Sequence, residues 1–598
     1  MILQSLCELA EREQLVGDPA FEKKAVRWIV VLDASGRFVD VRDTSAPESL
    51  PSTNRTKWRW HPELTLIPRR QERSSGIRAN FLVDNGKYAL GFSATPEEKD
   101  DPRHRLCHAA FVSLLREAPQ DVPQLQSLLA FLANEEELNA CAVCLASKGS
   151  FANKDLFGFE VDGIALSDLD RLRNWWGSHA DQAKEELEPI QCLVCGKYRQ
   201  PARLHNSIQI RGASASGAPL ISFNVASFEK YGLRGNENAP VCRVCMTAYT
   251  EALRRLTRPQ YETASGKKLQ AQRILLNGNT TVVYWCECQS ALPQLLTAMD
   301  SDPKSVKDAV NGSFDESSSR FYCLILSGAQ GRASIRYFRI GTVGEVIANL
   351  RRYFCTIDID RRDRNVPLTF FRLLTRMAPN GERDRLPSEI GIELWVHTVF
   401  GDKLPYGFLN ALVARNQAEH TVPEERAALL HLYFASGDAK STDVGISDLH
   451  SCTEKHSMSL DCESTDLPYL FGRLLAIMEN LQSAAQGTNL GRILVARTFR
   501  LASTRPGQVF PSLLQASQQQ LARASRKVPA RAANLNRLIG EVLNGIPANG
   551  LSPVFNLEQQ GRFALGYYHQ RQVFFDRNGD MGKASIETAN DSSGETMA

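Results

Sequence analysis

Three Cys-x-x-Cys pairs are the residues of this sequence whose type and spacing best suit metal chemistry. Tetrahedral zinc takes four soft ligands, and two such pairs joined by an intervening segment supply them in a zinc ribbon. Gly196 can relax the turn after the second pair, and Pro240 precedes the third, whereas the first pair lies in a helical pattern and is interpreted as buried thiols. The pairs are, in chain order, Cys141/Cys144, Cys192/Cys195 and Cys242/Cys245.

Cys192, Cys195, Cys242 and Cys245 are therefore the predicted ligands of a structural zinc ion. Four protein ligands leave no open position on the metal, so this site would stabilise the fold and would not catalyse a reaction. The zinc would fasten segment 219–256, which carries the third pair and the start of a basic helix, to the region before it.

The rest of the sequence lacks several common signatures of catalysis. It has no Gly-x-x-x-x-Gly-Lys-[Ser/Thr] phosphate loop, no His-Glu-x-x-His and no His-Asp dipeptide. Asp358, Asp360 and Asp363 could together hold Mg²⁺, but the arginines beside them favour a salt-bridged surface. We therefore expect a binding protein and no enzyme, with a metal-dependent nuclease and a zinc-ribbon scaffold as the alternatives.

Positive charge is concentrated in two parts of a chain whose formal net charge is only +3. Residues 51–78 carry seven Lys and Arg against two Glu, with Trp58 and Trp60 among them, and are interpreted as an irregular loop. Such a loop could contact phosphates and enter a groove, or it could be a solvated surface.

Residues 478–575 are the second concentration, with eleven Lys and Arg against three Glu. The segment has a helical pattern with short loops. Helices with one basic surface suit a bundle that lies along a nucleic-acid backbone. A soluble bundle that happens to be basic is the alternative.

Apolar periodicity divides the chain into an α+β front and a helical rear. Hairpins are predicted over 27–41 and 80–92, a buried strand over 278–288, and a strand, turn and strand over 321–340. Helices are predicted over 104–147 and 166–187, and an exposed linker or loop over 299–319. The predicted regions are an α+β N-terminal region with a mixed sheet and a zinc-ribbon element at 1–340, a mainly helical middle region at 341–470, a basic α-helical bundle at 471–578 and a disordered tail at 579–598.

The composition is that of a soluble protein, with 43% hydrophobic residues and a mean hydropathy of −0.28. No stretch approaches the eighteen or so apolar residues of a membrane helix, and the N-terminus is acidic where a signal peptide would be basic. We therefore expect a cytoplasmic protein whose fourteen cysteines are buried thiols and metal ligands, with no disulfide framework.

Several segments, in order along nearly the whole chain, resemble the large subunit of the type I-C CRISPR Cascade. The resemblance implies a non-catalytic subunit of an RNA-guided surveillance complex. The segments are MILQSLCEL at 1–9, NFLVDNGKYALGF at 80–92, SFNVASFEKYG and NAP within 222–240, TTVVYW at 280–285, LILSGAQGRASIRYF at 324–338 and GYYHQRQ at 566–572.

The resemblance also implies partners. They are the backbone, guide 5′-end-binding and small subunits, CRISPR RNA, target double-stranded DNA with its displaced single strand, and a helicase-nuclease that docks on the complex. The large subunit recognises the protospacer-adjacent motif in the duplex and assists strand separation. The C-terminal portion resembles the small subunit, which can be made from an internal start, for which Met478 and Met458 are the candidates.

On this interpretation three groups of residues are assigned to binding. Charged groups contact phosphates and Asn80 reaches base edges, where hydrogen bonding discriminates. The DNA-binding candidates are Lys57, Arg59, Arg69, Arg70, Arg73, Arg78 and Asn80 at the duplex, and Arg497, Arg500, Arg523, Arg526, Lys527 and Arg531 at the displaced strand. The candidates for contact with the guide or with subunits are Phe223, Asn224, Tyr231 and Asn238.

Overall fold

The computed structural model of the chain contains two compact units, each made of more than one segment of the sequence. The first comprises residues 1–206, 222–253 and 262–269, and the second comprises 207–221, 254–261 and 270–598. None of the described helices is long and apolar enough to cross a membrane. The structure describes residues 1–17, 20–50, 57–69, 76–92, 102–148, 151–182, 188–223, 225–229, 231–262, 268–288, 290–299, 303–312, 318–329, 331–361, 366–438, 459–486, 488–547 and 554–591.

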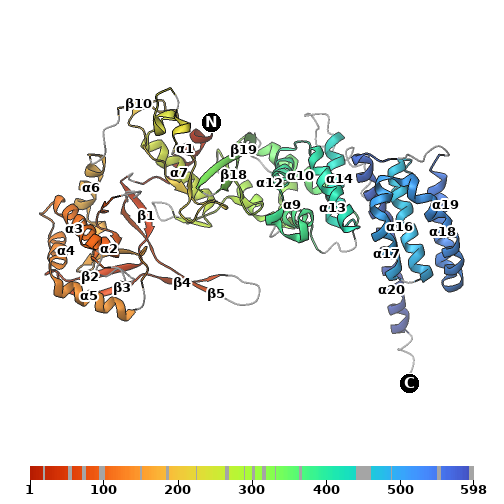
Figure 1. Cartoon of the computed structure of the whole chain (residues 1–598), viewed down its shortest axis with the longest axis horizontal. Coiled ribbons are helices and arrows are strands. Elements are labelled where there is room, and N and C mark those ends of the chain that lie inside the picture. The colour runs from red at the N-terminus through yellow and green to blue at the C-terminus, as the bar shows by residue number, and fades with distance from the viewer. Residues whose placement is uncertain are drawn as a thin grey trace, which may run out of the picture. The chain divides into compact units, whose positions relative to one another are not determined.

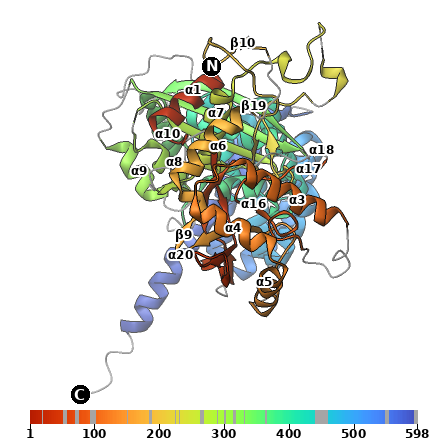
Figure 2. The same ribbon diagram turned by 90° about the vertical axis from the view of Figure 1, so that its left-hand side faces the viewer.

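The first unit is built on a five-stranded mixed sheet of order β3-β2-β8-β7, with β9 paired to β8. β2 and β8 are parallel, and their β-branched and aromatic residues are buried on both faces. Helices α3, α4 and α5 precede β8 in the chain and lie beside the sheet (Figures 1 and 2). The elements in this part of the chain are α1 (Ile2–Arg12), β1 (Phe21–Ala25), β2 (Trp28–Leu32), β3 (Phe38–Asp43), β4 (Ala46–Leu50), β5 (Lys57–His61), β6 (Leu64–Pro68), β7 (Asp84–Asn85), α2 (Gly86–Ala89), α3 (Pro102–Glu117), α4 (Pro123–Ala133), α5 (Glu135–Lys148), β8 (Leu156–Val161), β9 (Ile164–Ala165), α6 (Asp170–Gln182), β10 (Ile190–Gln191), β11 (Tyr198–Arg199), η3 (Ala226–Phe228), η4 (Gly235–Asn238) and α7 (Arg243–Thr257).

Of the two predicted hairpins, the one over 27–41 is confirmed by the antiparallel pairing of β2 with β3. The one over 80–92 is wrong, because Asp84 and Asn85 form a short strand and α2 follows at once. The Asp84 carboxylate accepts hydrogen bonds from the backbone N–H groups of Asn80 and Asn85. This local bonding replaces the expected β-turn.

The basic segment 51–78, predicted to be an irregular loop, contains two strands. β5 pairs with β4 in a two-stranded hairpin, and β6 pairs with β1 (Figure 1). Trp58 and Trp60 alternate with charged residues at the period of a strand, a signal that the density of charge obscured. Residues 51–56 and 70–75 lie outside the described residues.

The second unit contains a four-stranded antiparallel sheet of order β16-β17-β18-β19. β17 is the buried strand that the sequence predicts, and β18 and β19 form the predicted strand, turn and strand as a long hairpin. The predicted linker over 299–319 contains helix α9, whose Val306 and Val310 are buried. The elements are β12 (Ser207–Ile208), β13 (Ala218–Pro219), β14 (Gln260–Glu262), β15 (Lys268–Gln270), β16 (Arg273–Leu275), β17 (Thr280–Cys286), α8 (Leu292–Ala298), α9 (Pro303–Asn311), β18 (Arg320–Ala329), β19 (Arg332–Thr342), α10 (Val343–Thr356), α11 (Phe370–Met377), α12 (Ser388–Phe400), α13 (Tyr406–Glu419), α14 (Glu424–Asp438), α16 (Leu467–Gln486), α17 (Thr488–Thr504), α18 (Pro506–Lys527), α19 (Pro529–Asn544) and α20 (Leu557–Asp591).

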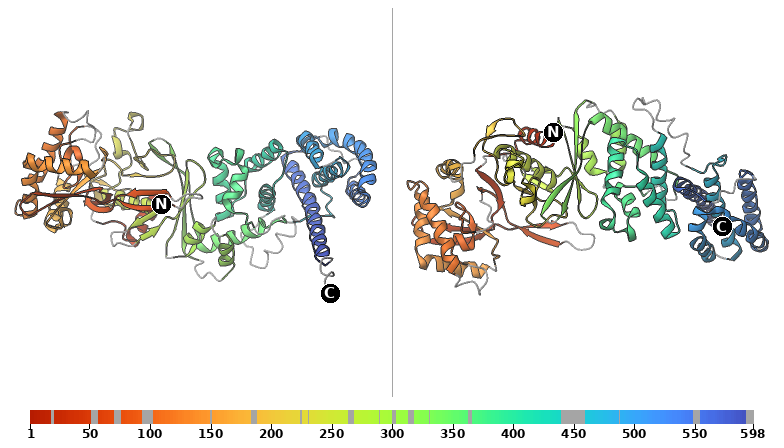
Figure 3. Two further views of the ribbon diagram at one scale, coloured as in Figure 1. Left: turned by 90° about the horizontal axis from the view of Figure 1, so that it is seen from below. Right: turned by 45° about the horizontal axis from the view of Figure 1, so that its top comes forward.

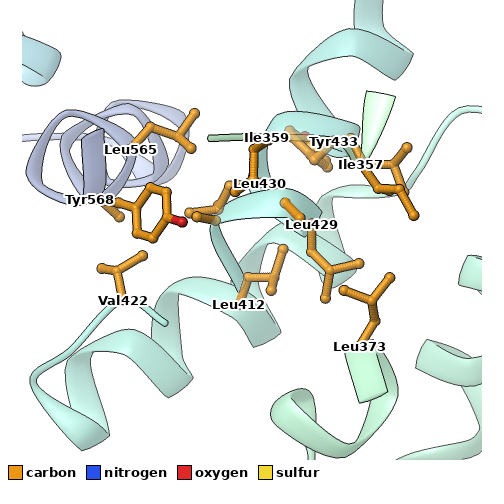
Figure 4. Packing of buried hydrophobic residues seen from close by; sticks show 14 of the residues in the cluster. Ile357, Ile359, Leu373, Leu412, Val422, Leu429, Leu430, Tyr433, Leu565 and Tyr568 are labelled. Carbon is orange, nitrogen blue, oxygen red and sulfur yellow. The ribbon is translucent and has the colours of Figure 1, made fainter. Parts of the chain in front are cut away.

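The region after residue 341 is mainly helical, as the sequence predicts (Figure 3). Its helices share one cluster of buried apolar residues, in which Leu565 and Tyr568 of α20 pack near Leu412, Val422 and Leu430 (Figure 4). The predicted domain boundary at residue 470 falls inside α16. The predicted disordered tail at 579–598 overlaps α20, which extends to Asp591.

Helices α16 and α20 approach each other closely at two glycines. A Cβ on Gly472 would lie 2.0 Å from a backbone carbonyl oxygen of α20, and one on Gly566 would lie 2.1 Å from a backbone carbonyl oxygen of α16. Tyr469 Oη and His569 Nδ1 share a hydrogen bond of 2.9 Å across the same pair of helices. The close approach thus lets buried polar groups of the two helices meet.

We expect Gly472→Ala to lower the free energy of unfolding by at least about 3 kcal/mol, because the new methyl group collides with backbone that cannot move aside locally. Chemical denaturation measures the change. Gly540→Ala is the matched control: this glycine of α19 is exposed and a Cβ added to it would meet no atom within 4 Å, so alanine should stabilise the helix by up to about 1 kcal/mol. Equal effects of both substitutions would contradict the packing.

The stability of the second unit should also depend on pH through His569. Burial, with a smaller effect of His431, lowers the pKa of His569 to about 3, so the folded ring stays neutral while the unfolded ring titrates near its usual pKa of about 6.5. Below that pH the unfolded state binds the extra proton, and stability falls by up to about 1.4 kcal/mol per pH unit. His569→Asn should reduce this slope in denaturation series between pH 7 and pH 4, and an unchanged slope would contradict the assignment.

Candidate metal centre and nucleic-acid-binding residues

The four cysteines predicted as metal ligands lie together, with their sulfur atoms all within 4.8 Å of one another. The first pair lies in the turn between β10 and β11, and the second lies at the start of α7. Two backbone hydrogen bonds join these segments, from Leu193 N–H to the Pro240 carbonyl at 2.9 Å and from Ala202 N–H to the Val241 carbonyl at 2.8 Å. The four ligands are Cys192, Cys195, Cys242 and Cys245.

Backbone N–H groups point at the sulfur of Cys192. Those of Val194 and Cys242 donate to it at 3.4 and 3.3 Å. Burial raises the pKa of the Cys192 thiol, but the N–H groups of Cys242, Cys195 and Val194 outweigh burial and lower the pKa to about 7. Burial raises the pKa of Cys242 to about 12. A bound cation would hold all four thiols in the ionised form, so the cluster is compatible with a metal site.

A fifth cysteine, which the sequence pattern did not single out, lies beside the cluster. Cys7 of α1 donates its thiol hydrogen to the Cys245 carbonyl oxygen, with 3.5 Å between sulfur and oxygen. A hydrogen bond with the Cys7 side chain raises the pKa of the Cys245 thiol, and burial raises it further. Cys7 is 238 residues away in the chain and belongs to no Cys-x-x-Cys pair, so its spacing carried no signal.

Cys141 and Cys144 lie on α5 and do not join the cluster, as the sequence predicts. Cys141 is fully buried, and burial raises its pKa to about 12. Cys144 is half-buried, and its sulfur lies 3.5 Å from a carboxylate oxygen of Asp40. Within the described ranges, the four-cysteine cluster is the one group of three or more His, Cys, Asp or Glu residues whose ligand atoms lie close enough together to hold a metal ion.

Purified full-length chain should contain one tightly bound metal ion, because four thiolates at this spacing satisfy a tetrahedral ion completely. Elemental analysis measures the stoichiometry. Cys242→Ser should lower it and should lower the midpoint of thermal unfolding, since the site and the fold are coupled. Cys288→Ser is the control, because Cys288 is exposed and lies outside the cluster. A stoichiometry near zero, or a metal retained by Cys242→Ser, would contradict the site.

The predicted duplex-binding residues are only partly described. Arg70 and Arg73 lie outside the described residues, and for Lys57 and Arg59 the structure places the backbone in β5. Their role stays a prediction.

Three side chains of this group are described. Arg78 is exposed, whereas the Arg69 guanidinium donates to the Phe21 carbonyl oxygen at 3.1 Å. Asn80 is 3% exposed, and its N–H donates to Asp84, so this conformation does not present the Asn80 amide to a base edge as the sequence interpretation expected. Arg78 is therefore the described residue of the group best placed for a phosphate.

The predicted cations of the C-terminal bundle are exposed, and four of them form no ion pair with an acidic side chain within the described part of the chain. Lys527 Nζ donates to the Ala485 carbonyl at the end of α16, and Arg531 donates to the side-chain oxygen of Asn480, so both partners are neutral. By contrast, Arg537 pairs with Glu541. The four cations are Arg497 and Arg500 on α17 and Arg523 and Arg526 on α18.

The predicted contact residues in segment 223–238 differ in accessibility. Asn224 lies outside the described residues, and Phe223 is half-buried. The Asn238 amide donates to the carbonyl oxygens of Leu233 and Gly235, which closes the turn η4. Tyr231 is 98% exposed and has a positive φ of 55°. Tyr231 is therefore the described member of this group that is open to a partner.

The aspartates of the alternative nuclease site do not form a metal-binding group within the described residues. Asp358 pairs with Lys307 at 3.0 Å, as the salt-bridge interpretation expects. The Asp360 carbonyl accepts a hydrogen bond from Tyr568, and Asp363 lies outside the described residues.

One family model matches the sequence over nearly its whole length. It is described as CRISPR-associated protein (Cas_Csd1), and it matches residues 4–575. The matched range includes the four clustered cysteines, Cys7, the basic segment 51–78 and the exposed cations of the bundle. No curated protein matches the sequence.

Proposed function

The chain belongs to the family of CRISPR-associated proteins described as Cas_Csd1, and from this membership we propose that it is the large subunit of a type I-C Cascade complex. The match over residues 4–575 carries the proposal. The protein assembles with CRISPR RNA and the other subunits, recognises the protospacer-adjacent motif in duplex DNA, assists strand separation, holds the displaced strand and helps to recruit the helicase-nuclease. Guide pairing reads most of the sequence, and the protein reads the short motif and the backbone.

The bundle supplies the surface for the displaced strand. Single-stranded nucleic acid is held by cations that follow its phosphates. Arg497 and Arg500 are three residues apart on α17 and therefore share one face of that helix. Arg523 and Arg526 have the same spacing on α18, which packs against α17. Because none of these four pairs with an acidic side chain among the described residues, their charge is available to phosphates.

Segment 51–78 contacts the target DNA duplex in this proposal. The β4–β5 hairpin, whose second strand lies in this segment, and the exposed Arg78 support this assignment, because a two-stranded hairpin can enter a groove while cations hold the phosphates on either side. Because Asn80 is buried, base contact by its side-chain amide requires this segment to open.

Zinc is the metal that the four-cysteine cluster suits best. Four thiolates around Zn²⁺ at about 2.3 Å give sulfur–sulfur separations of about 3.8 Å. Cys195 Sγ and Cys242 Sγ are 3.9 Å apart, and all four sulfurs lie within 4.8 Å. All four ligands come from the protein, so the ion is structural, in keeping with a subunit that binds and does not cleave.

Replacing Arg497, Arg500, Arg523 and Arg526 together by Ala tests the proposed function of the bundle. Each lost phosphate contact should lower the slope of log affinity against log salt by about 0.7 for a single strand, or about 3 for the four. Fluorescence anisotropy with labelled single-stranded DNA, on the assembled complex and at several salt concentrations, measures the slope.

Arg537→Ala is the matched control, since this arginine of the same bundle already pairs with Glu541. It should leave the slope unchanged. The same slope for the fourfold variant and the control would refute the assignment of the bundle. Cleavage of DNA by the isolated chain with Mg²⁺ or Mn²⁺ would refute the non-catalytic role.

A further inference from the structure

The segments around the four cysteines expose a group of apolar and aromatic side chains. Leu193, Tyr198, Leu204 and Val244 are 58%, 73%, 65% and 50% exposed. Backbone hydrogen bonds join the three segments that carry them, so they belong to one part of the surface. Apolar side chains gathered at a surface mark a site of interaction. We define the knuckle surface as Leu193, Lys197, Tyr198, Arg199, Leu204 and Val244.

The charge of the knuckle surface is positive. Lys197 and Arg199 flank Tyr198 directly, and all three are exposed. Neither cation forms an ion pair with the acidic residues that the structure describes. An exposed aromatic residue with a cation on either side of it in the sequence suits single-stranded nucleic acid, whose bases stack on aromatic faces while long cationic side chains reach the flanking phosphates. In a duplex the same base faces are already stacked and out of reach.

The hairpin that carries Tyr198 is closed by backbone hydrogen bonds. Cys192 N–H donates to the Lys197 carbonyl at 3.0 Å, and Gly196 N–H donates to the Cys192 carbonyl at 2.9 Å. Gly196 has a φ of 70°, which glycine adopts without strain, and Tyr198 pairs with Gln191 across the two strands. A backbone that is already ordered loses little freedom on binding, and this favours affinity.

A second exposed ring lies in a segment attached to the same cluster. Tyr231 is 98% exposed and has a φ of 55°, a left-handed conformation that costs a tyrosine free energy and here returns no buried area. Asn236, five residues on, donates its amide to the Ala202 carbonyl beside the cluster. Backbone strain of this kind is concentrated at binding sites.

We propose that the knuckle surface is a stacking platform for single-stranded nucleic acid, with Tyr198 against a base and Lys197 and Arg199 on the adjoining phosphates. The proposal rests on the proposed function only for the source of the strand, which is the guide RNA. Docking of another protein on Leu193, Leu204 and Val244 is the competing use of this surface, and the cations beside the ring favour the nucleic acid.

The test uses the full-length chain and a fluorescein-labelled oligouridylate. Tyr198→Ala should weaken binding about 10-fold, whereas Tyr198→Phe keeps the ring and should bind like the parent. Lys197→Ala with Arg199→Ala should lower the salt slope by about 1.4. Tyr406→Ala is the matched control, because Tyr406 is 57% exposed on α13 and distant in sequence from the cluster. Metal content and thermal unfolding show that each variant is folded.

Each measurement is repeated in the chain that carries the four bundle substitutions. If Tyr198→Ala still weakens RNA binding there, the knuckle surface acts by itself, whether or not the bundle binds DNA. Equal affinities of Tyr198→Ala and Tyr406→Ala in both backgrounds overturn the proposal. So does a Tyr198→Ala chain that binds RNA normally but loses a protein subunit from the assembled complex, because that result assigns the surface to protein docking. If the four bundle substitutions alone change the salt slope of single-stranded DNA binding by less than expected, that result bears only on the proposed function of the bundle.

Discussion

Four sulfur atoms within 4.8 Å of one another impose the strongest local constraint on the first unit. The first pair lies between strands of only two residues each, and the second pair lies at the N-terminus of α7, so little backbone pairing joins the two segments. Ionised thiols at this separation repel, and a cation among them converts the repulsion into attraction. A metal ion held by the four thiols would therefore fasten these segments together, and the Cys7 thiol brings the N-terminal helix to the same point.

This constraint explains why a binding surface can be both exposed and fixed. In most proteins a large exposed ring lies on a mobile loop, and binding must order it. Here Tyr198 follows a turn closed by Cys192 and Gly196, so its backbone is ordered although its ring is exposed. The segments around the cysteines thus combine an ordered backbone with exposed side chains.

The cysteine cluster could be predicted from the sequence because Cys-x-x-Cys spacing is itself the geometry of a metal turn. Strands and helices could be predicted wherever apolar residues repeat with a period of two residues or of 3.6 residues. The failures have local causes. The Asp84 carboxylate accepts a hydrogen bond from the Asn80 backbone, and the predicted hairpin does not form. The charged residues of β5 and the polar residues of α9 obscure the sequence patterns of an ordinary strand and of an amphipathic helix. The pairing of Arg537 with Glu541 is visible in the sequence, because the two lie one helical turn apart. The contact of Arg531 with Asn480 of α16 depends on the fold and has no such signal.

The close crossing of α16 and α20 bears on where a separately translated C-terminal protein could begin. Met478 lies in the middle of α16, so a product that starts there keeps the contacts of Glu479 with α20 but lacks Gly472 and Tyr469, which make the close approach and a buried hydrogen bond to α20. A product that starts at Met458 keeps α16 whole. The geometry of one helix pair therefore favours Met458 as the start codon of an independently folded small subunit.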